Sequence, residues 1–265
     1  MSEVSAAVLD VAVSVRGDLP NGIVGYARRK IAAVADWTDQ PILYARVRLT
    51  QQPDPAVALP VRAQVNLDVN GRLLRAQVAA ATGYAAVDLL QETVRQRLAR
   101  FAQHWQARRG RWPEAGSPTW RHGAPRTQRP PYYPRPEEER EIVAHKSLAP
   151  SRLTAADAAW EMDAMDYDFY LFTEVDTGQD SVLYRDGGTG YRLARLTPVP
   201  TAPTTDEVPM TVSGQAAPTA TVPQAVARLE ITGWPFVFFA DRDSGRGRVL
   251  YHRYDGHYGL ITPVG

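Results

Sequence analysis

Apolar residues in the first hundred positions follow two spacings, one typical of strands and one typical of helices. Val11, Val13 and Val15 alternate with other residues, which predicts a strand over residues 8–16. A helix is predicted over residues 20–37, because proline suits a first helical turn and apolar residues then recur at helical spacing. Its apolar positions are Ile23, Tyr26, Ala27, Ile31 and Val34.

Three more strands are predicted, two of them from strict alternation. Residues 45–49 and 61–69 alternate apolar residues with polar ones, so each strand has one covered face and one polar face. Asn70-Gly71 follows at once and is a strong hairpin signal, because both central residues of a type I′ turn need a positive φ. The partner strand is predicted over residues 72–80.

A long helix follows these strands. Thr82 can cap a helix over residues 84–106, in which apolar residues at helical spacing form a buried stripe. That stripe consists of Val87, Leu90, Val94, Leu98 and Phe101. The order βαβββα predicts an α+β domain over residues 1–106, with two helices on one face of a four-stranded sheet.

Arginine, proline and glycine crowd together over residues 107–146, where no period survives. Before Glu137 this stretch contains seven arginines and a single acidic residue, Glu114. Prolines keep such a linker extended, and its charge gives it affinity for a polyanion without a fold. A passive tether is the alternative reading.

The rest of the chain contains an internal repeat. Residues 154–193 align without a gap with residues 221–260 at an offset of 67. Identical pairs include Phe169/Phe236, Phe172/Phe239, Val182/Val249, Tyr184/Tyr251 and Tyr191/Tyr258. Each copy is predicted to form a short helix, an aromatic strand, a turn and two further strands. The sequence thus indicates two small α+β copies over residues 147–198 and 220–265, joined by a proline-rich linker over residues 199–219.

A unit of about 45 residues is close to the size at which a lone core is marginal. Each copy is therefore expected to pair through an apolar sheet face, with the other copy or with another chain. The predicted pairing residues are Phe169, Phe172, Val182, Tyr184, Phe236, Phe239, Val249 and Tyr251. A base-stacking platform is the alternative for these aromatic residues, but their acidic surroundings oppose RNA.

Charge divides the chain more sharply than its net value of +1 suggests. Residues 1–136 contain 19 Lys/Arg and 10 Asp/Glu, a balance of +9, whereas residues 137–265 contain 11 and 19, a balance of −8. A basic half joined to an acidic half indicates that the first half meets a polyanion.

Composition excludes several classes of protein. The chain has no cysteine, which excludes disulfides and thiolate zinc sites and suits the cytoplasm. No apolar run approaches the roughly 20 residues of a membrane span, and the first residues lack a basic secretory start, so no membrane partner is expected. The five histidines are scattered, and no phosphate-cradling loop or nucleophile elbow is present. We therefore expect no enzyme, no cofactor and no metal.

The repeated motifs resemble a known family. KSLAP at residues 146–150, YDFYLF at residues 167–172 and YDGHYGLI at residues 254–261 resemble the C-terminal domain of long ribosome hibernation promoting factors of the S30EA type. The βαβββα order and YAAVD at residues 84–88 resemble the N-terminal domain of that family. The resemblance covers nearly all of the chain outside the linkers.

This resemblance implies a function. In that family the N-terminal domain binds the small ribosomal subunit where messenger and transfer RNA would lie, and blocks translation without catalysis in dormant or stressed cells. The implied partner is 16S rRNA, whose phosphates would supply most of the affinity. The residues expected to bind RNA are Arg28, Arg29, Lys30, Arg95, Arg97, Arg100, Arg108, Arg109 and Arg111. Solvation and helix pairing are the alternative roles for these side chains.

The duplicated copy departs from that family, whose long members usually have one C-terminal domain that pairs two factors and two ribosomes. A linker of about twenty residues gives an effective concentration on the order of millimolar, which favours pairing within the chain. We therefore expect single ribosomes to be silenced. The alternatives are a ribosome-dimerising factor, with copies exchanged between chains, or a regulatory protein that docks on a non-ribosomal partner.

Overall fold

The protein is described by a computed structural model that covers residues 9–53, 57–108, 135–186, 190–200, 203 and 208–264, with the side chains of residues 103–108 left out. The chain divides into two compact units. The first contains the elements up to the helix that ends at Arg108, and the second contains nearly all elements that follow. Both units combine helices and strands, so the predicted mixed α+β class is confirmed.

The first unit is built on a four-stranded sheet with the order β1-β2-β3-β4. Its strands are β1 (Val11–Arg16), β2 (Ile42–Gln51), β3 (Val61–Val69) and β4 (Arg72–Ala80). β1 and β2 are parallel, because α1 (Ile23–Ala32) and the short 3-10 helix η1 (Ala33–Trp37) carry the chain across between them. The other neighbours are antiparallel.

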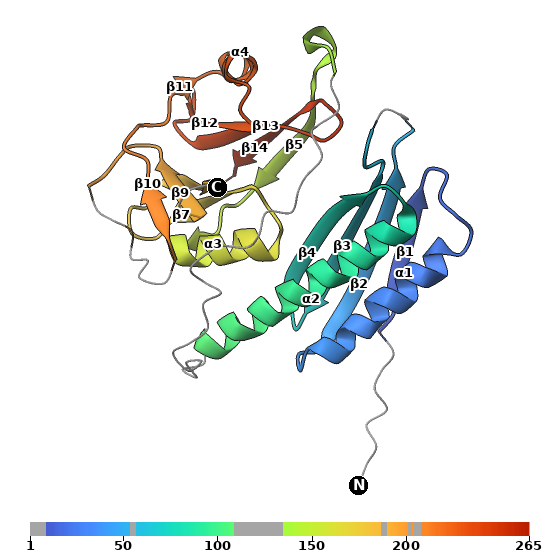
Figure 1. The fold of residues 1–265 in the computed structure, drawn as a ribbon. Coiled ribbons are helices and arrows are strands. Elements are labelled where there is room, and N and C mark those ends of the chain that lie inside the picture. Colours follow the sequence, from blue (N-terminus) through green and yellow to red (C-terminus); the bar gives the residue numbers. More distant parts are fainter. Residues whose placement is uncertain are drawn as a thin grey trace. The chain divides into compact units, whose positions relative to one another are not determined.

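Both long helices of this unit cover one face of the sheet. α1 packs on β1 and on α2 (Gly83–Arg108), and α2 packs on β3 and β4. Figure 1 shows the two helices side by side over the strands. Alternate residues of β3 are buried beneath them, which fits the alternation in the sequence. At the β3–β4 turn, Asn70 and Gly71 have φ values of 53° and 83°, as the turn type requires.

The second unit contains two five-stranded sheets, each with a helix. The first sheet has the order β10-β9-β8-β7-β6 and carries α3 (Ala155–Ala164). Its strands are β6 (Arg152–Leu153), β7 (Phe169–Glu174), β8 (Asp180–Asp186), β9 (Gly190–Arg195) and β10 (Met210–Val212). The second sheet has the order β11-β12-β13-β14-β5 and carries α4 (Val222–Thr232). Its strands are β5 (Ile142–Leu148), β11 (Thr219–Ala220), β12 (Phe236–Asp241), β13 (Gly247–His252) and β14 (Tyr258–Pro263).

Each sheet takes one strand from the segment that precedes the other copy. β5 precedes the first copy, yet it runs parallel to β14 of the second copy, with His145 opposite Leu260. β10 precedes the second copy, yet it runs parallel to β9 of the first copy, with Val212 opposite Leu193. We call β5 and β10 the exchanged strands. The sequence did not predict them: both predicted linkers contain an exchanged strand, because an edge strand with few buried residues leaves no clear period.

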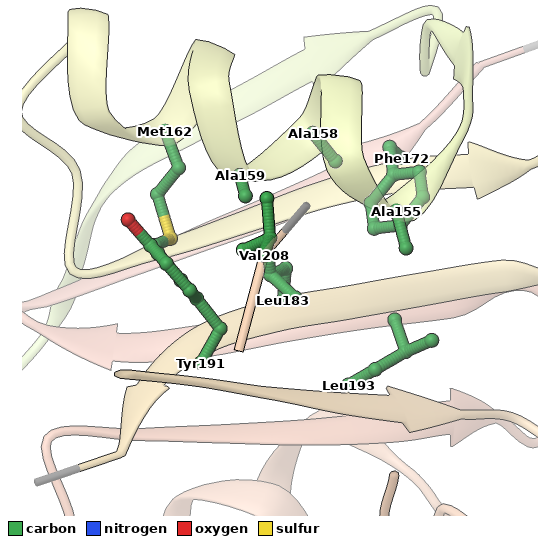
Figure 2. Close-up of a cluster of buried hydrophobic side chains, with 9 residues drawn as sticks. All are labelled: Ala155, Ala158, Ala159, Met162, Phe172, Leu183, Tyr191, Leu193 and Val208. Carbon is green, nitrogen blue, oxygen red and sulfur yellow. The ribbon is translucent and has the colours of Figure 1, made fainter. Parts of the chain in front are cut away.

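Each helix of the second unit packs on one face of its own sheet. Under α3 the buried cluster consists of Ala155, Ala158, Ala159, Met162, Phe172, Leu183, Tyr191, Leu193 and Val208, as Figure 2 shows. Three alanines on the buried side of α3 let the helix lie close to the strands. The corresponding cluster under α4 includes Leu229, Val237, Phe239, Leu250 and Leu260. The opposite face of each sheet is therefore left for another partner.

A membrane span was not expected, and among the described residues no helix is both long enough and apolar enough to be one.

Candidate nucleic-acid surface and pairing face

The first candidate site is the outer side of the two helices in the first unit. Lys30 on α1 forms an ion pair with Asp88 on α2, with Nζ and Oδ1 2.8 Å apart. The Tyr26 hydroxyl donates to the same Oδ1 at 2.7 Å. Hydrogen bonds from Lys30 and then from Tyr26 lower the pKa of Asp88. Lys30 thus helps to join the two helices, one of the alternative roles considered for it.

Other cationic side chains lie exposed on these helices. Arg28 and Arg29 are exposed on α1, and the Arg28 Nε donates to the carbonyl oxygen of Val11 at 3.3 Å. Arg95 is exposed on α2 and donates twice to Glu92, at 2.8 and 2.7 Å. Hydrogen bonds from Arg95 and Gln96 lower the pKa of Glu92 to about 2. An exposed ion pair of this kind contributes little stability, so Arg95 can exchange Glu92 for a phosphate at small cost.

The remaining predicted RNA-binding residues are placed differently. Arg97 points toward the sheet, since its Nη1 donates to the carbonyl oxygen of Arg75 on β4 at 3.2 Å. Its side chain is 8% exposed and lies beside Leu98 of the buried stripe, so it is not part of the exposed cationic surface that was expected. Arg100 is half-buried on α2. Arg108 ends α2, and its side chain lies outside the described part of the chain, as do Arg109 and Arg111 entirely.

A second cationic surface lies on the face of the sheet that the helices leave uncovered. It is formed by Arg16 on β1, Arg46 and Arg48 on β2, Arg62 on β3 and Arg75 on β4, and we call it the sheet-face arginines. In the register of the sheet, Arg46 lies opposite Asn66, which lies opposite Arg75. Sequence reasoning did not assign these side chains to RNA. The signal was present, because arginines that alternate with buried residues on one strand must share its open face.

The second candidate site is the face that the two small copies turn toward each other. Its buried centre is formed by Leu171 and Val182 of the first copy and by Phe238 and Val249 of the second. The rings of Phe169 and Phe236 have centroids 4.7 Å apart. The ring centroid of Tyr251 lies 5.5 Å from that of Phe169, and the ring centroid of Tyr184 lies 5.4 Å from that of Phe236. We call this set of contacts the cross-copy face.

The cross-copy face brings together most of the predicted pairing residues, but two of them lie elsewhere. Phe172 is buried under α3, and Phe239 is buried under α4, each in the core of its own copy. The expectation that they belong to the pairing face is therefore corrected. Alternate residues of a strand point to opposite faces, so Phe236 and Phe238 face the other copy while Val237 and Phe239 face the helix.

A polar cluster holds the exchanged strand β5 to the second copy. Arg140, just before β5, forms an ion pair with Glu230 on α4, and the Tyr258 hydroxyl donates to the same carboxylate. Burial alone would raise the pKa of Glu230, but the hydrogen bonds from Tyr258 and Arg140 lower it. Burial and the Glu230 carboxylate raise the pKa of Tyr258 to about 12. Burial lowers the pKa of the neighbouring His252.

The first copy contains a fully buried ion pair whose equivalent positions are occupied differently in the second copy. Arg195 donates from Nε and Nη2 to the two oxygens of Glu174, at 2.7 and 2.6 Å, and neither side chain is exposed. The equivalent positions of the second copy, 67 residues later, are Asp241 and Thr262. The two copies therefore share a fold but differ in their polar interiors.

Within the described residues, no three His, Cys, Asp or Glu side chains gather where they could hold a metal ion.

The chain is similar to several known proteins. The family described as Sigma 54 modulation/S30EA ribosomal protein C terminus matches residues 137–193 and 211–260. A protein of Mycobacterium tuberculosis named "Dormancy associated translation inhibitor" is 38% identical over 230 residues, which cover 83% of this chain and 77% of that protein. A "Ribosome hibernation promotion factor" of Deinococcus radiodurans is 30% identical over 176 residues, 63% of this chain and 88% of that protein.

A solved structure, the N-terminal domain of Thermus thermophilus Protein Y, is 22% identical and covers 35% of this chain and 99% of that domain, with a TM-score of 0.29. The extent and identity of the Mycobacterium match are sufficient to assign the family, and the S30EA family description matches two segments of this chain. The chain belongs to the S30EA family of long ribosome hibernation promoting factors.

Proposed function

We propose that this protein silences ribosomes in dormant or stressed cells, and that it does so on single ribosomes. Its first unit binds the small subunit at the decoding region, where messenger and transfer RNA would lie, and blocks translation by occupying that space. Its two small copies pair with each other and not with copies on a second ribosome. The observation that carries this proposal is the packing of Phe169, Leu171 and Val182 against Phe236, Phe238 and Val249 of the same chain.

The charge of the first unit supports contact with ribosomal RNA. Arg28, Arg29 and Arg95 are exposed on adjacent helices that pack side by side. Folded RNA is recognised largely through its phosphates and its shape, so a cluster of guanidinium groups suits it. The sheet-face arginines offer a second surface of the same sign. Binding through either surface would weaken steeply as salt rises, because phosphate contacts release counterions.

Two features of the second unit support pairing within the chain. The cross-copy face covers apolar side chains of both sheets, which a lone copy would leave in water. The exchanged strands also occupy one edge of each sheet, at β9 and at β14, where another chain could otherwise add a strand. Both features oppose pairing with a second ribosome-bound factor.

Sedimentation of ribosomes saturated with the protein tests this proposal. We expect the protein to move with single ribosomes at low salt and to leave them at high salt. Abundant ribosome dimers would overturn single-ribosome silencing and favour a dimerising factor. Failure to move with ribosomes at low salt would favour a regulator with a non-ribosomal partner.

A further inference from the structure

The cross-copy face is nearly symmetric, and this raises the question of how a copy recognises the right partner. Phe169 and Phe236 are equivalent residues of the two copies, as are Val182 and Val249, and both pairs belong to the same contact. Apolar contacts between equivalent residues would form almost as well between two first copies or two second copies. The polar residues of the face are therefore the first candidates for a contact that distinguishes unlike from like copies.

One polar contact in the cross-copy face is strongly asymmetric. Asp180 begins β8 in the first copy and is 4% exposed. Its equivalent in the second copy is Gly247, which begins β13 and whose N–H donates to Asp180 Oδ2 at 2.9 Å. Arg246 donates to the same carboxylate, from Nε at 2.7 Å and from Nη2 at 3.2 Å. The Thr173 hydroxyl donates to its Oδ1 at 3.4 Å.

Space at this point allows only a glycine opposite Asp180. A Cβ added to Gly247 would lie 2.8 Å from the Asp180 Cβ and 2.8 Å from Cε2 of the Phe238 ring. Neither distance is tolerated by packed carbon atoms, so either the copies would separate or the strand would shift. Glycine here is required by the approach of Asp180 from the first copy and by the Phe238 ring of the second copy itself.

Two first copies would meet badly at this contact. Asp180 would face a second Asp180, and Gln179 would stand where Arg246 stands in the second copy. Two carboxylates would then be buried against each other without the cation that now pairs with one of them, in addition to the collision of their Cβ atoms. Like charges desolvated at an interface strongly disfavour a complex.

Two second copies would lose the contact in another way. Gly247 would face a second Gly247, so its buried N–H would lose its carboxylate acceptor, and two Arg246 side chains would approach the same region. Phe238 would also replace its smaller equivalent, Leu171, on the opposing sheet. A buried donor without an acceptor carries a desolvation penalty, so this pair is disfavoured too.

We propose that the contact of Asp180 with Arg246 and Gly247 is a specificity device, which makes the first copy pair with a second copy and reject another first copy. This inference rests on the proposed pairing within the chain and deepens it. Each face is satisfied only by its unlike partner, and the nearest unlike partner is on the same chain. The device thus acts against pairing between chains through like copies.

The test measures a distance inside the full-length protein. The chain has no cysteine, so Asp176→Cys and Asp243→Cys introduce two spin-label sites at equivalent, exposed turns of the two copies. Labelled protein is diluted into unlabelled protein, so that only distances within a chain are recorded by pulsed electron resonance. We expect one narrow distance distribution for the otherwise unchanged chain.

Variants then make the two copies alike or exchange their identities. Arg246→Gln with Gly247→Asp makes both copies resemble the first, and Gln179→Arg with Asp180→Gly makes both resemble the second. We expect each double variant to raise the fraction of chains outside the narrow distribution at least tenfold. All four substitutions together, with Leu171→Phe and Phe238→Leu to exchange the neighbouring side chain as well, move the contact to its symmetric position in this exchanged variant and should restore the narrow distribution. Gly214→Asp is the matched control, because Gly214 is exposed and has no atom within 4 Å of an added Cβ.

The outcomes separate this inference from the proposed function. A broad distribution in the otherwise unchanged chain would overturn pairing within the chain itself. A narrow distribution there, kept by both double variants, would overturn only the specificity device. Should a double variant lose its circular dichroism, the exchanged variant decides. Return of the narrow distance distribution supports the specificity device, and its absence overturns the device.

Discussion

Phe169 and Phe236 occupy equivalent positions 67 residues apart in the chain, and their rings meet with centroids 4.7 Å apart. Tyr251 and Tyr184, another equivalent pair, close around them from the two sheets. Aromatic pairs at this separation contribute beyond the area that they bury. The internal repeat thus produces an interface from one chain, in which Phe169 meets its own counterpart at the centre.

The Phe236 ring should therefore stabilise the pair of copies and not the copy to which it belongs. Phe236→Ala is expected to reduce the free energy of unfolding of the second unit by about 2 kcal/mol, because the ring is half-buried between the sheets. Urea denaturation followed by tryptophan fluorescence measures this. Ile231→Ala is a suitable control, since Ile231 is 86% exposed. Equal losses in the two variants would contradict the assignment of Phe236 to the cross-copy face.

Phe239, three residues further along, should behave differently. Its side chain is fully buried under α4, so Phe239→Ala is expected to remove about 3–5 kcal/mol and to unfold the second copy itself. Circular dichroism should fall in this variant, whereas Phe236→Ala should keep its helical signal. If both variants kept the same dichroism and lost the same stability, the division of β12 into two faces would be wrong.

The buried pair of Arg195 and Glu174 provides a second test of the fold. Arg195→Met removes the cation and leaves the buried Glu174 carboxylate with the Thr177 hydroxyl, in a site where neither Arg195 nor Glu174 is exposed. We expect a loss of about 3–5 kcal/mol in the stability of the second unit, measured by urea denaturation. Replacing both residues, as in Glu174→Gln with Arg195→Met, should recover part of that loss. No recovery would indicate that the guanidinium acts through its other contact, with the carbonyl oxygen of Val199.

The sequence predicted the first unit well because its signals are local. Alternation over residues 61–69 matches β3, and Asn70-Gly71 forms the turn with both φ values positive. The apolar stripe of α2 is buried as expected, yet Arg97 lies on its sheet side. A long side chain can occupy such a position when its guanidinium reaches a backbone carbonyl. Charge alone therefore misassigned this residue to the RNA surface.

The second unit was harder to predict because its decisive contacts are long-range. β5 pairs with a strand more than a hundred residues away, and a parallel edge strand needs no local hairpin signal. The aromatic residues of β7 and β12 were predicted to pair. Because apolar residues follow one another without a break in these strands, the alternation that places Phe169 and Phe172 on opposite faces of the sheet was not apparent. The pairing of Asp180 with Arg246 joins positions that no spacing rule connects.

The stability of the second unit should depend on pH through His252. Burial lowers the pKa of His252 below its usual 6.5, with Arg140 acting in the same direction and Glu230 opposing it. The unfolded chain therefore takes up a proton that the folded chain resists, so stability falls as pH drops below about 6.5. His252→Gln should weaken this dependence between pH 7 and pH 5 in thermal unfolding. His145→Gln, at an exposed position of β5, is the control.

Two groups close to His252 set the limits of this test. The pKa of Glu230 is lowered, so its contribution is lost only as pH falls well below 5, outside the measured range. Tyr258 has a pKa of about 12 and keeps its proton throughout. An unchanged slope in His252→Gln would show that the imidazole is protonated as easily in the folded chain as in water.

The exchanged strand β5 should depend on the ion pair that precedes it. The side chains of Arg140 and Glu230 are 14% and 15% exposed. Arg140→Ala removes the guanidinium from the Glu230 carboxylate, which keeps the hydrogen bond from the Tyr258 hydroxyl. We expect amide hydrogen exchange to accelerate at least tenfold, equivalent to about 1.4 kcal/mol, in β5 and in the paired strand β14. Arg152→Ala, at an exposed position of β6, should leave these amides unchanged. Equal acceleration of amide hydrogen exchange in both sheets would instead indicate that the variant destabilises the whole second unit.

The surface that meets RNA can be identified by two matched double variants. Arg28→Glu with Arg29→Glu reverses two charges on α1, and Arg46→Glu with Arg48→Glu reverses two on β2, so both variants change the net charge equally. All four side chains are exposed, and neither pair should disturb the core.

If the helices meet RNA, the α1 variant should pellet with ribosomes on the order of a hundredfold more weakly at low salt, because each reversal replaces a phosphate contact with repulsion. The β2 variant should then lose much less affinity for ribosomes. The reverse order would assign binding to the sheet-face arginines, and equal losses would mean that only overall charge matters.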